Sequence, residues 1–161
     1  MKYVLALFVS SLIFSCGIKE VANVTTKEVS TVGEFLFEGP NTLQGPSTLQ
    51  LKELANKAGT DPNKIKAIYL SGATVAFSPG ILRGSVESVL VQWVSDDLPL
   101  VSVATKSPLP ATGPITLEAN PNEDLLAYLN DPSATLVVDV NLTGDADQLD
   151  ATVSFDLNIT Y

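Results

Sequence analysis

The sequence predicts an all-β fold, and the clearest evidence lies near its C-terminal end. Between Leu149 and Tyr161 every second residue is apolar and the residues between are polar, which is typical of a strand with one face on a core and the other in water. Residues 136–142 alternate in the same way. The polar, glycine-containing residues 144–148 separate the two runs, so we expect an antiparallel hairpin.

Five further segments carry weaker strand patterns, and turn-forming residues separate most of them. In chain order they are residues 29–38, 65–77, 86–95, 100–105 and 115–119. Gly72 interrupts the second of these and indicates a bulge or bend. The pattern predicts an antiparallel, immunoglobulin-like β-sandwich of about seven strands. We expect its core to contain Phe35, Phe37, Leu70, Val75, Phe77, Val91, Trp93, Val138, Val140, Val153, Phe155 and Leu157.

Two short helices are expected in the connections. Ser47 and Gln50 have the spacing of a capping box before residues 51–58, and Gly59 fits the end of that helix. Asn120, followed by Pro121 and Glu123, predicts the start of a second helix that leads into residues 125–129. Both would cover strand edges that could otherwise pair with another chain.

The N-terminal segment has the features of a secretory signal. Lys2 gives it a basic start, and residues 4–14 are almost entirely apolar, but this run is shorter than the roughly 20 residues that span a bilayer. Cys16 follows a serine and is the only cysteine. The segment resembles the lipobox of bacterial lipoproteins. We therefore expect three parts: a signal peptide at residues 1–15, a lipidated N-terminus and tether at 16–28, and a sandwich domain at 29–161.

The resemblance implies that Cys16 carries a diacylglyceryl group and an N-acyl chain such as palmitate, which would hold the protein on a lipid bilayer. Gly17 stands where an aspartate would favour retention in the inner membrane, so the resemblance implies the outer membrane. Lys19 and Glu20 are similar to the start of the surface-export signal of Bacteroidetes lipoproteins. The periplasmic and the surface-exposed face of that membrane both stay open.

The net charge argues against two kinds of direct electrostatic partner. The chain has a formal charge of −9, and removal of Lys2 with a signal peptide would make it one unit more negative. Nucleic acids and anionic membrane surfaces attract clusters of lysine and arginine, so neither is expected as a direct electrostatic partner.

Side chains that commonly carry catalysis are scarce. Histidine is absent, which excludes Ser-His-Asp chemistry and the common imidazole metal sites, and the lipid would occupy Cys16. Residues 80–84 contain two glycines without the spacing of a nucleotide-binding loop, and Arg83 is the only arginine. We expect no cofactor and no enzymatic activity.

Two acidic groups leave alternatives open. Asp145, Asp147 and Asp150 in the expected hairpin could hold calcium, although their spacing lacks the glycine and the distal glutamate of the EF-hand loop. Asp96 and Asp97 lie in an expected turn, and a glycosidase would need one of them to face a second carboxylate. The simpler interpretation is that both groups keep surface loops soluble.

The mature domain resembles small uncharacterised β-sandwich lipoproteins of Bacteroidetes. The resemblance rests on the helix that begins at Leu51, on residues 61–66, on the strand around Trp93, on residues 124–129 and on the alternating C-terminal segment. A more distant similarity is to late-embryogenesis-abundant type-14 domains. Neither group supplies functional residues.

The sequence therefore predicts a lipid-anchored protein of the cell envelope that acts as a non-enzymatic binding or structural module. A carboxylate-dependent hydrolase of envelope or extracellular glycans is one alternative. A calcium-dependent adhesion module is the other.

Overall fold

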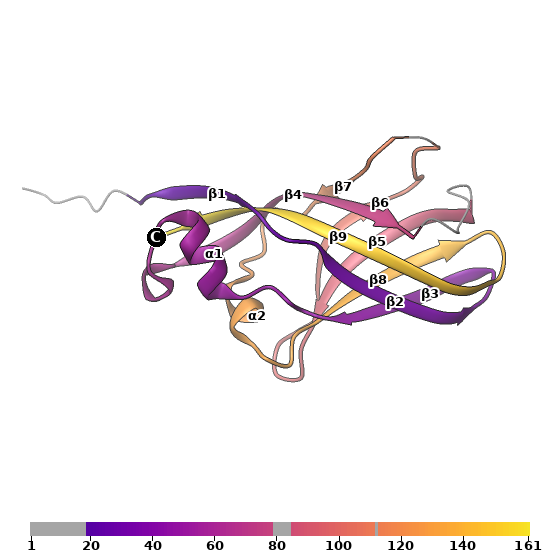
Figure 1. The fold of residues 1–161 in the computed structure, drawn as a ribbon, viewed down its shortest axis with the longest axis horizontal. Coiled ribbons are helices and arrows are strands. Elements are labelled where there is room, and N and C mark those ends of the chain that lie inside the picture. Colours follow the sequence, from indigo (N-terminus) through magenta and orange to yellow (C-terminus); the bar gives the residue numbers. More distant parts are fainter. Residues whose placement is uncertain (1–18, 79–84, 112) are drawn as a thin grey trace, which may run out of the picture.

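The computed structural model describes residues 19–78, 85–111 and 113–161, and in these residues the fold is all-β (Figure 1). The expected signal peptide, Cys16, and residues 80–84 with Arg83 lie outside the described residues. The strands are β1 (Val21–Thr25), β2 (Val29–Leu36), β3 (Gly39–Pro46), β4 (Ala67–Phe77), β5 (Val86–Val94), β6 (Val101–Lys106), β7 (Ile115–Ala119), β8 (Thr135–Leu142) and β9 (Ala146–Thr160). The helices are α1 (Leu51–Ala58), the short 3₁₀ helix η1 (Pro62–Lys64) and α2 (Leu126–Asn130).

All strand pairs are antiparallel, and the pairing closes on itself. The described strands form one sheet of nine in the order β1-β9-β2-β3-β8-β5-β6-β7-β4, and β4 also pairs with β9. On one edge of β9 lies β4, and on the other edge β1 and β2 follow one another. The expected all-β, antiparallel fold is confirmed, with nine strands instead of about seven.

The two strands that the sequence pattern misses are β1 and β3. β1 lies inside the expected tether and pairs with the end of β9 from Val21 to Thr25, so the sheet begins earlier than the predicted boundary at residue 29. β3 contains two glycines and two prolines, which disfavour strands. Gly45 is needed there because a Cβ atom would lie 2.1 Å from the carbonyl oxygen of Ser30 on β2. Close approach of two backbones, rather than strand propensity, explains that position.

The predicted hairpin between residues 136–142 and 149–161 is wrong. β8 pairs with β3 and β5, whereas β9 pairs with β1, β2 and β4. The connection between β8 and β9 therefore takes the chain from one part of the sheet to another. Alternation of apolar residues shows which face of a strand is buried, but it does not show which strand lies alongside.

The core is built mainly from the expected side chains. Trp93 on β5 and Phe155 on β9 are fully buried, with ring centroids 5.0 Å apart. Leu70, Val75, Val91, Val138, Val140, Val153 and Leu157 are also buried as expected, and Phe77 is partly buried against them. The register shift between Leu70 and Gly72 confirms the irregularity that Gly72 predicts.

Phe35 and Phe37 are corrections to the expected core, because they are 77% and 68% exposed. The inward face of β2 contains Val29, Thr31 and Gly33, and the next buried residue is Leu36. The alternation therefore changes phase at Phe35, whose φ angle is 53°. A strict period of two across this segment gave the wrong face for both rings.

Both helices lie where they were predicted, and α1 has the expected bounds Leu51–Ala58, whereas α2 covers Leu126–Asn130 instead of residues 125–129. Gly59 caps the C-terminus of α1, and its φ of 71° is the left-handed conformation that glycine tolerates best. The expected capping box of Ser47 and Gln50 is wrong, because the N-cap is Gln50 and it makes no side-chain cap. α2 begins later than expected. The carboxylate of Asp124 accepts hydrogen bonds from the backbone N–H groups of Leu126 and Ile68, both at 3.0 Å, and so ties the start of α2 to β4.

Neighbouring substitutions on β9 test these assignments of buried and outward faces. We expect Val153→Asp to lower the free energy of unfolding by roughly 3–5 kcal/mol, because it buries an unpaired charge in place of a packed side chain. Thr152→Asp, on the outward face, should cost about 1 kcal/mol or less. Urea unfolding of the two variants measures the difference, and equal destabilisation would contradict the assignment.

Candidate functional site

An exposed aromatic cluster lies at one end of the molecule. The turn between β2 and β3 and the connection between β8 and β9 lie together there, while α1 and the C-terminus lie at the opposite end (Figure 1). The backbone N–H of Glu38 in the turn donates a hydrogen bond to Oδ1 of Asp145 at 2.9 Å, which joins the two connections. A hollow of about 310 Å³ lies between them. Its lining residues, called the aromatic tip below, are Phe35, Leu36, Phe37, Asp145, Ala146 and Asp147.

Phe35 is presented in a strained conformation. Its φ of 53° is unusual for a bulky residue, because the Cβ atom crowds the backbone in the left-handed region. The ring makes little compensating contact, since it is largely exposed. A conformational cost without burial is typical of residues retained for function.

The backbone beneath the rings is fixed by side-chain hydrogen bonds. Oδ1 of Asn41 accepts from the N–H of Phe37 at 3.1 Å, and its Nδ2 donates to the carbonyl oxygens of Phe37 at 2.6 Å and Gly39 at 2.9 Å. With the bond from Glu38 to Asp145, these contacts fix the turn that carries Phe37. The aromatic tip is therefore preorganised, and binding there would cost less loop entropy.

Among the residues that the structure describes, the charged side chains in or next to the aromatic tip have one sign. Glu34, Glu38, Asp145 and Asp147 are exposed. The sequence has no lysine or arginine at residues 28–51 or 107–161, the ranges that contain β2, β3, β8 and β9. Among the described residues the lysines lie elsewhere, namely Lys19, Lys27, Lys52, Lys57, Lys64, Lys66 and Lys106.

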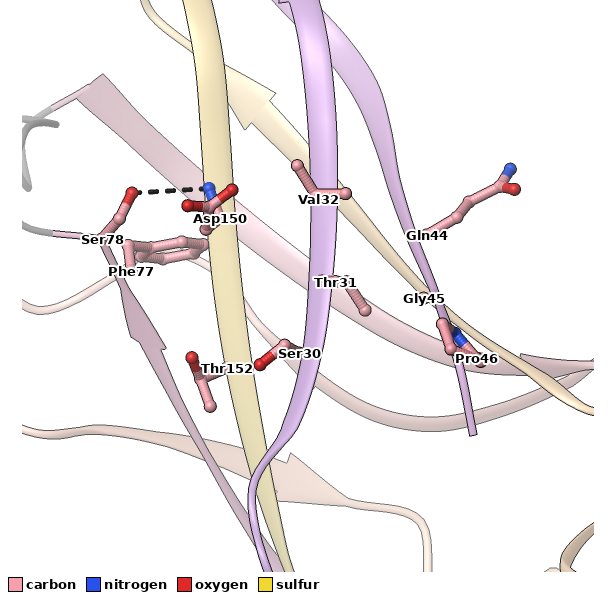
Figure 2. Close-up of a pocket in the computed structure, with 10 residues that line it drawn as sticks. All are labelled: Ser30, Thr31, Val32, Gln44, Gly45, Pro46, Phe77, Ser78, Asp150 and Thr152. Atoms are coloured by element: carbon pink, nitrogen blue, oxygen red, sulfur yellow. Dashed lines mark hydrogen bonds between the residues drawn. The ribbon is translucent and has the colours of Figure 1, made fainter. Parts of the chain in front are cut away.

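A second hollow, a groove of about 460 Å³, crosses the outer side of the sheet (Figure 2). Its lining residues are Ser30, Thr31, Val32, Gln44, Gly45, Pro46, Phe77, Ser78, Asp150 and Thr152. Figure 2 shows Phe77 and Ser78 on one side of β9 and β2, and Gln44 and Pro46 on the other. Val32↔Gln44 is the single register pair between β2 and β3, and the two backbones also approach closely at Ser30 and Gly45.

The groove offers hydroxyl groups and little charge. Asp150 is the only ionisable side chain among the lining residues, and its Oδ1 accepts a hydrogen bond from Nε2 of Gln148 at 2.8 Å. The N–H of Ser78 donates to the carbonyl oxygen of Asp150 at 3.0 Å, which anchors the end of β4. Because these lining residues include a single carboxylate, the groove lacks the carboxylate pair of a glycosidase. Its chemistry suits hydrogen bonding to a polar or extended ligand.

The three aspartates considered for calcium have separate roles. Asp145 accepts from the backbone of Glu38, Asp150 accepts from Gln148, and Asp147 lines the aromatic tip. Within residues 19–78, 85–111 and 113–161, no group of three His, Cys, Asp or Glu side chains is arranged to hold a metal ion. Calcium binding therefore stays an expectation from the sequence alone.

Asp96 and Asp97, the carboxylates considered for hydrolysis, lie exposed in the connection after β5. The carboxylate that binds to this connection is Asp131, which follows α2. Asp131 accepts hydrogen bonds from the hydroxyl of Ser95 and from the N–H and hydroxyl of Ser133, the latter two at 2.8 Å. These bonds, that from Ser95 first, lower the pKa of Asp131. Asp131 thus links the β5–β6 connection to the segment before β8. Sequence reasoning missed it, although Asp131-Pro132-Ser133 is a turn motif.

The lowered pKa of Asp131 predicts a pH-dependent effect on stability. Its bonds contribute stability that is present above the ordinary aspartate pKa of 3.8 and is lost as the pH falls through the lowered folded-state value. Asp131→Asn should therefore destabilise the protein at pH 7 more than at a pH well below 3.8. Urea unfolding at both pH values tests this, with Asp97→Asn as an exposed control that should change little. An effect independent of pH would show that the charge of Asp131 is not responsible.

The strain at Phe35 predicts that glycine is more stable at this position. Phe35→Gly should raise the free energy of unfolding by about 1 kcal/mol, because glycine adopts positive φ without the Cβ clash. Phe37→Gly is the matched control and should lower stability by about 0.5–1 kcal/mol through added chain entropy. Denaturant unfolding measures both, and destabilisation by Phe35→Gly would disprove the strain.

Comparisons with known proteins add little to this geometry. No family model and no curated protein matches the chain. One similar solved structure is described as turnip yellow mosaic virus, with 16% identity and a TM-score of 0.28 over 87% of this chain and 95% of that chain. So low a score supports no argument about fold or function. In the described part of the chain, no helix is long and apolar enough to cross a membrane.

Proposed function

We propose that the protein is a lipid-anchored module of the bacterial outer membrane, attached through acylated Cys16, which binds a partner without enzymatic activity. One observation carries this proposal. The chain enters the fold beside α1, and the preorganised aromatic tip lies at the opposite end (Figure 1). A lipid on Cys16 would hold the first end at the bilayer and direct the aromatic tip away from it.

The distribution of lysines supports this orientation. Six of the seven described lysines lie in or next to β1, α1, η1 and the start of β4, and the seventh is Lys106 on β6. The same segments carry four carboxylates, those of Glu20, Glu28, Glu53 and Asp61, and Glu53 pairs with Lys27, so six positive and four negative side chains leave a formal excess of two positive charges. Lysines close to an anionic bilayer surface contribute about 1 kcal/mol each. The total charge of −9 argued against such a contact, but the charges are segregated and the acidic residues of the aromatic tip lie at the far end. A lipid anchor and this basic end would act together.

The short link to the sheet also supports the orientation. β1 begins at Val21, five residues after Cys16, and five residues span at most about 18 Å. The expected lipidated N-terminus and tether of residues 16–28 would have given the domain far more freedom. With the shorter link, the basic end would stay close to the headgroups.

We also propose that the closed sheet is flattened into a sandwich of the immunoglobulin-like kind. The supporting contact is the packing of Trp93 on β5 against Phe155 on β9, with centroids 5.0 Å apart. These strands are not paired and stand far apart in the strand order, so their side chains meet across the core. A flattened sheet brings opposite strands into contact.

Removal of the proposed acylation site tests the anchor. Cys16→Ala should abolish incorporation of a fatty-acid probe during growth and release the protein from the outer-membrane fraction, because no other residue supplies the lipidated thiol. Ser11→Ala, in the same segment, is the matched control and should label normally. Unchanged labelling of the Cys16→Ala protein would rule out the anchor.

A further inference from the structure

We infer that the aromatic tip binds a basic, apolar segment of another polypeptide. This inference deepens the proposed binding function and rests on it. It concerns the exposed rings, the charges around them and the groove that follows them along β2.

The apolar part of the argument begins with the rings. Phe35 and Phe37 are the most exposed large apolar side chains among the described residues. They flank the buried Leu36 at the hollow of the aromatic tip, so a partner side chain placed there would contact apolar groups on several sides. Exposed aromatic groups on a fixed backbone are typical anchor points of protein interfaces.

The charges determine which partner fits. Asp145 and Asp147 line the hollow with the rings, the exposed Glu34 and Glu38 are next to Phe35 and Phe37 in the chain, and β2, β3, β8 and β9 contribute no lysine or arginine. An anionic lipid surface would be repelled here, whereas lysine or arginine would meet carboxylates and the faces of the phenylalanine rings. Charge complementarity therefore favours a cationic segment over a membrane.

The groove explains why the partner is a polypeptide. Val32 pairs with Asp150 in the groove, and four residues further along β2 Leu36 pairs with Ala146 at the aromatic tip. The two hollows are thus about 13 Å apart along one ladder. Hydroxyl groups of Ser30, Ser78 and Thr152 line the groove and can bind an extended backbone whose cationic and apolar side chains occupy the aromatic tip (Figure 2).

Binding of designed peptides to the full chain tests the inference. The probes are three peptides of equal length that alternate lysine with leucine, lysine with serine, and glutamate with leucine. We expect the lysine–leucine peptide to bind at least tenfold more tightly than the other two, measured by calorimetry, and to weaken as salt is raised. Equal binding of the lysine–serine peptide would contradict a role for the rings.

Variants of the full chain locate the site. The double substitution Phe35→Ser, Phe37→Ser should weaken binding of the lysine–leucine peptide at least tenfold, and Asp147→Asn should weaken it several-fold. The controls are Leu100→Ser, an exposed apolar residue elsewhere, and Asp97→Asn, an exposed carboxylate elsewhere, and both should bind normally. Unfolding curves show whether each variant is folded.

Three other results would overturn the inference. Vesicles of phosphatidylglycerol and phosphatidylethanolamine that bind through the two phenylalanines would identify a lipid surface instead. Self-association that the double variant abolishes would identify a second copy as the occupant. Equal peptide binding by the double variant would place the site elsewhere. A failed anchor test at Cys16 would leave these measurements unaffected, so the two failures are distinguishable.

Discussion

β9 is hydrogen-bonded along both edges, and the rest of the fold depends on this pairing. Its inward side chains from Leu149 to Ile159 are all fully buried. A shift of the pairing register by one residue would expose all of them to water. Thr26 completes its edge where β1 ends. The N–H of Thr26 donates to the carbonyl oxygen of Phe155 at 2.8 Å, and its hydroxyl accepts from the N–H of Phe155 at 3.0 Å. No backbone group of Phe155 is left unpaired, so β1 and β2 can follow one another along the same strand.

This framework explains how a strained residue persists at the aromatic tip. The segment of β2 that precedes Phe35 is fixed to β9 by consecutive pairs, and the segment that follows is held by Asn41 and Asp145. The backbone between two fixed ends has little freedom to relax. Glycine would be more stable at this position but would remove an exposed ring. The strain is therefore understandable if the ring is needed for binding, which is the direction in which such outliers are best interpreted.

The sequence predicted which face of each strand is buried better than it predicted which strands pair with one another. Alternation assigned Val153, Phe155 and Leu157 correctly, because burial of one face is a property of each strand alone. The pairing of β8 with β3 depends on contacts between distant segments, and the glycines and prolines of β3 conceal its strand pattern in the sequence. The sequence did not indicate the positive φ of Phe35, because positive φ usually occurs at glycine or asparagine. The fold class could thus be predicted, whereas most of the candidate site depends on tertiary structure.

One feature of the candidate site could nevertheless be recognised in the sequence, namely the lack of basic residues in two long ranges. Residues 28–51 and 107–161 contain no lysine or arginine, and the fold brings strands from both ranges together at the aromatic tip. A total charge of −9 averages this acidic region with a basic end and so describes neither. Because fields at a surface decay over about 10 Å in salt, a partner at either end responds to the local charge. The segregation of charge along the chain, rather than its sum, is therefore the electrostatic property that a partner at either end would meet.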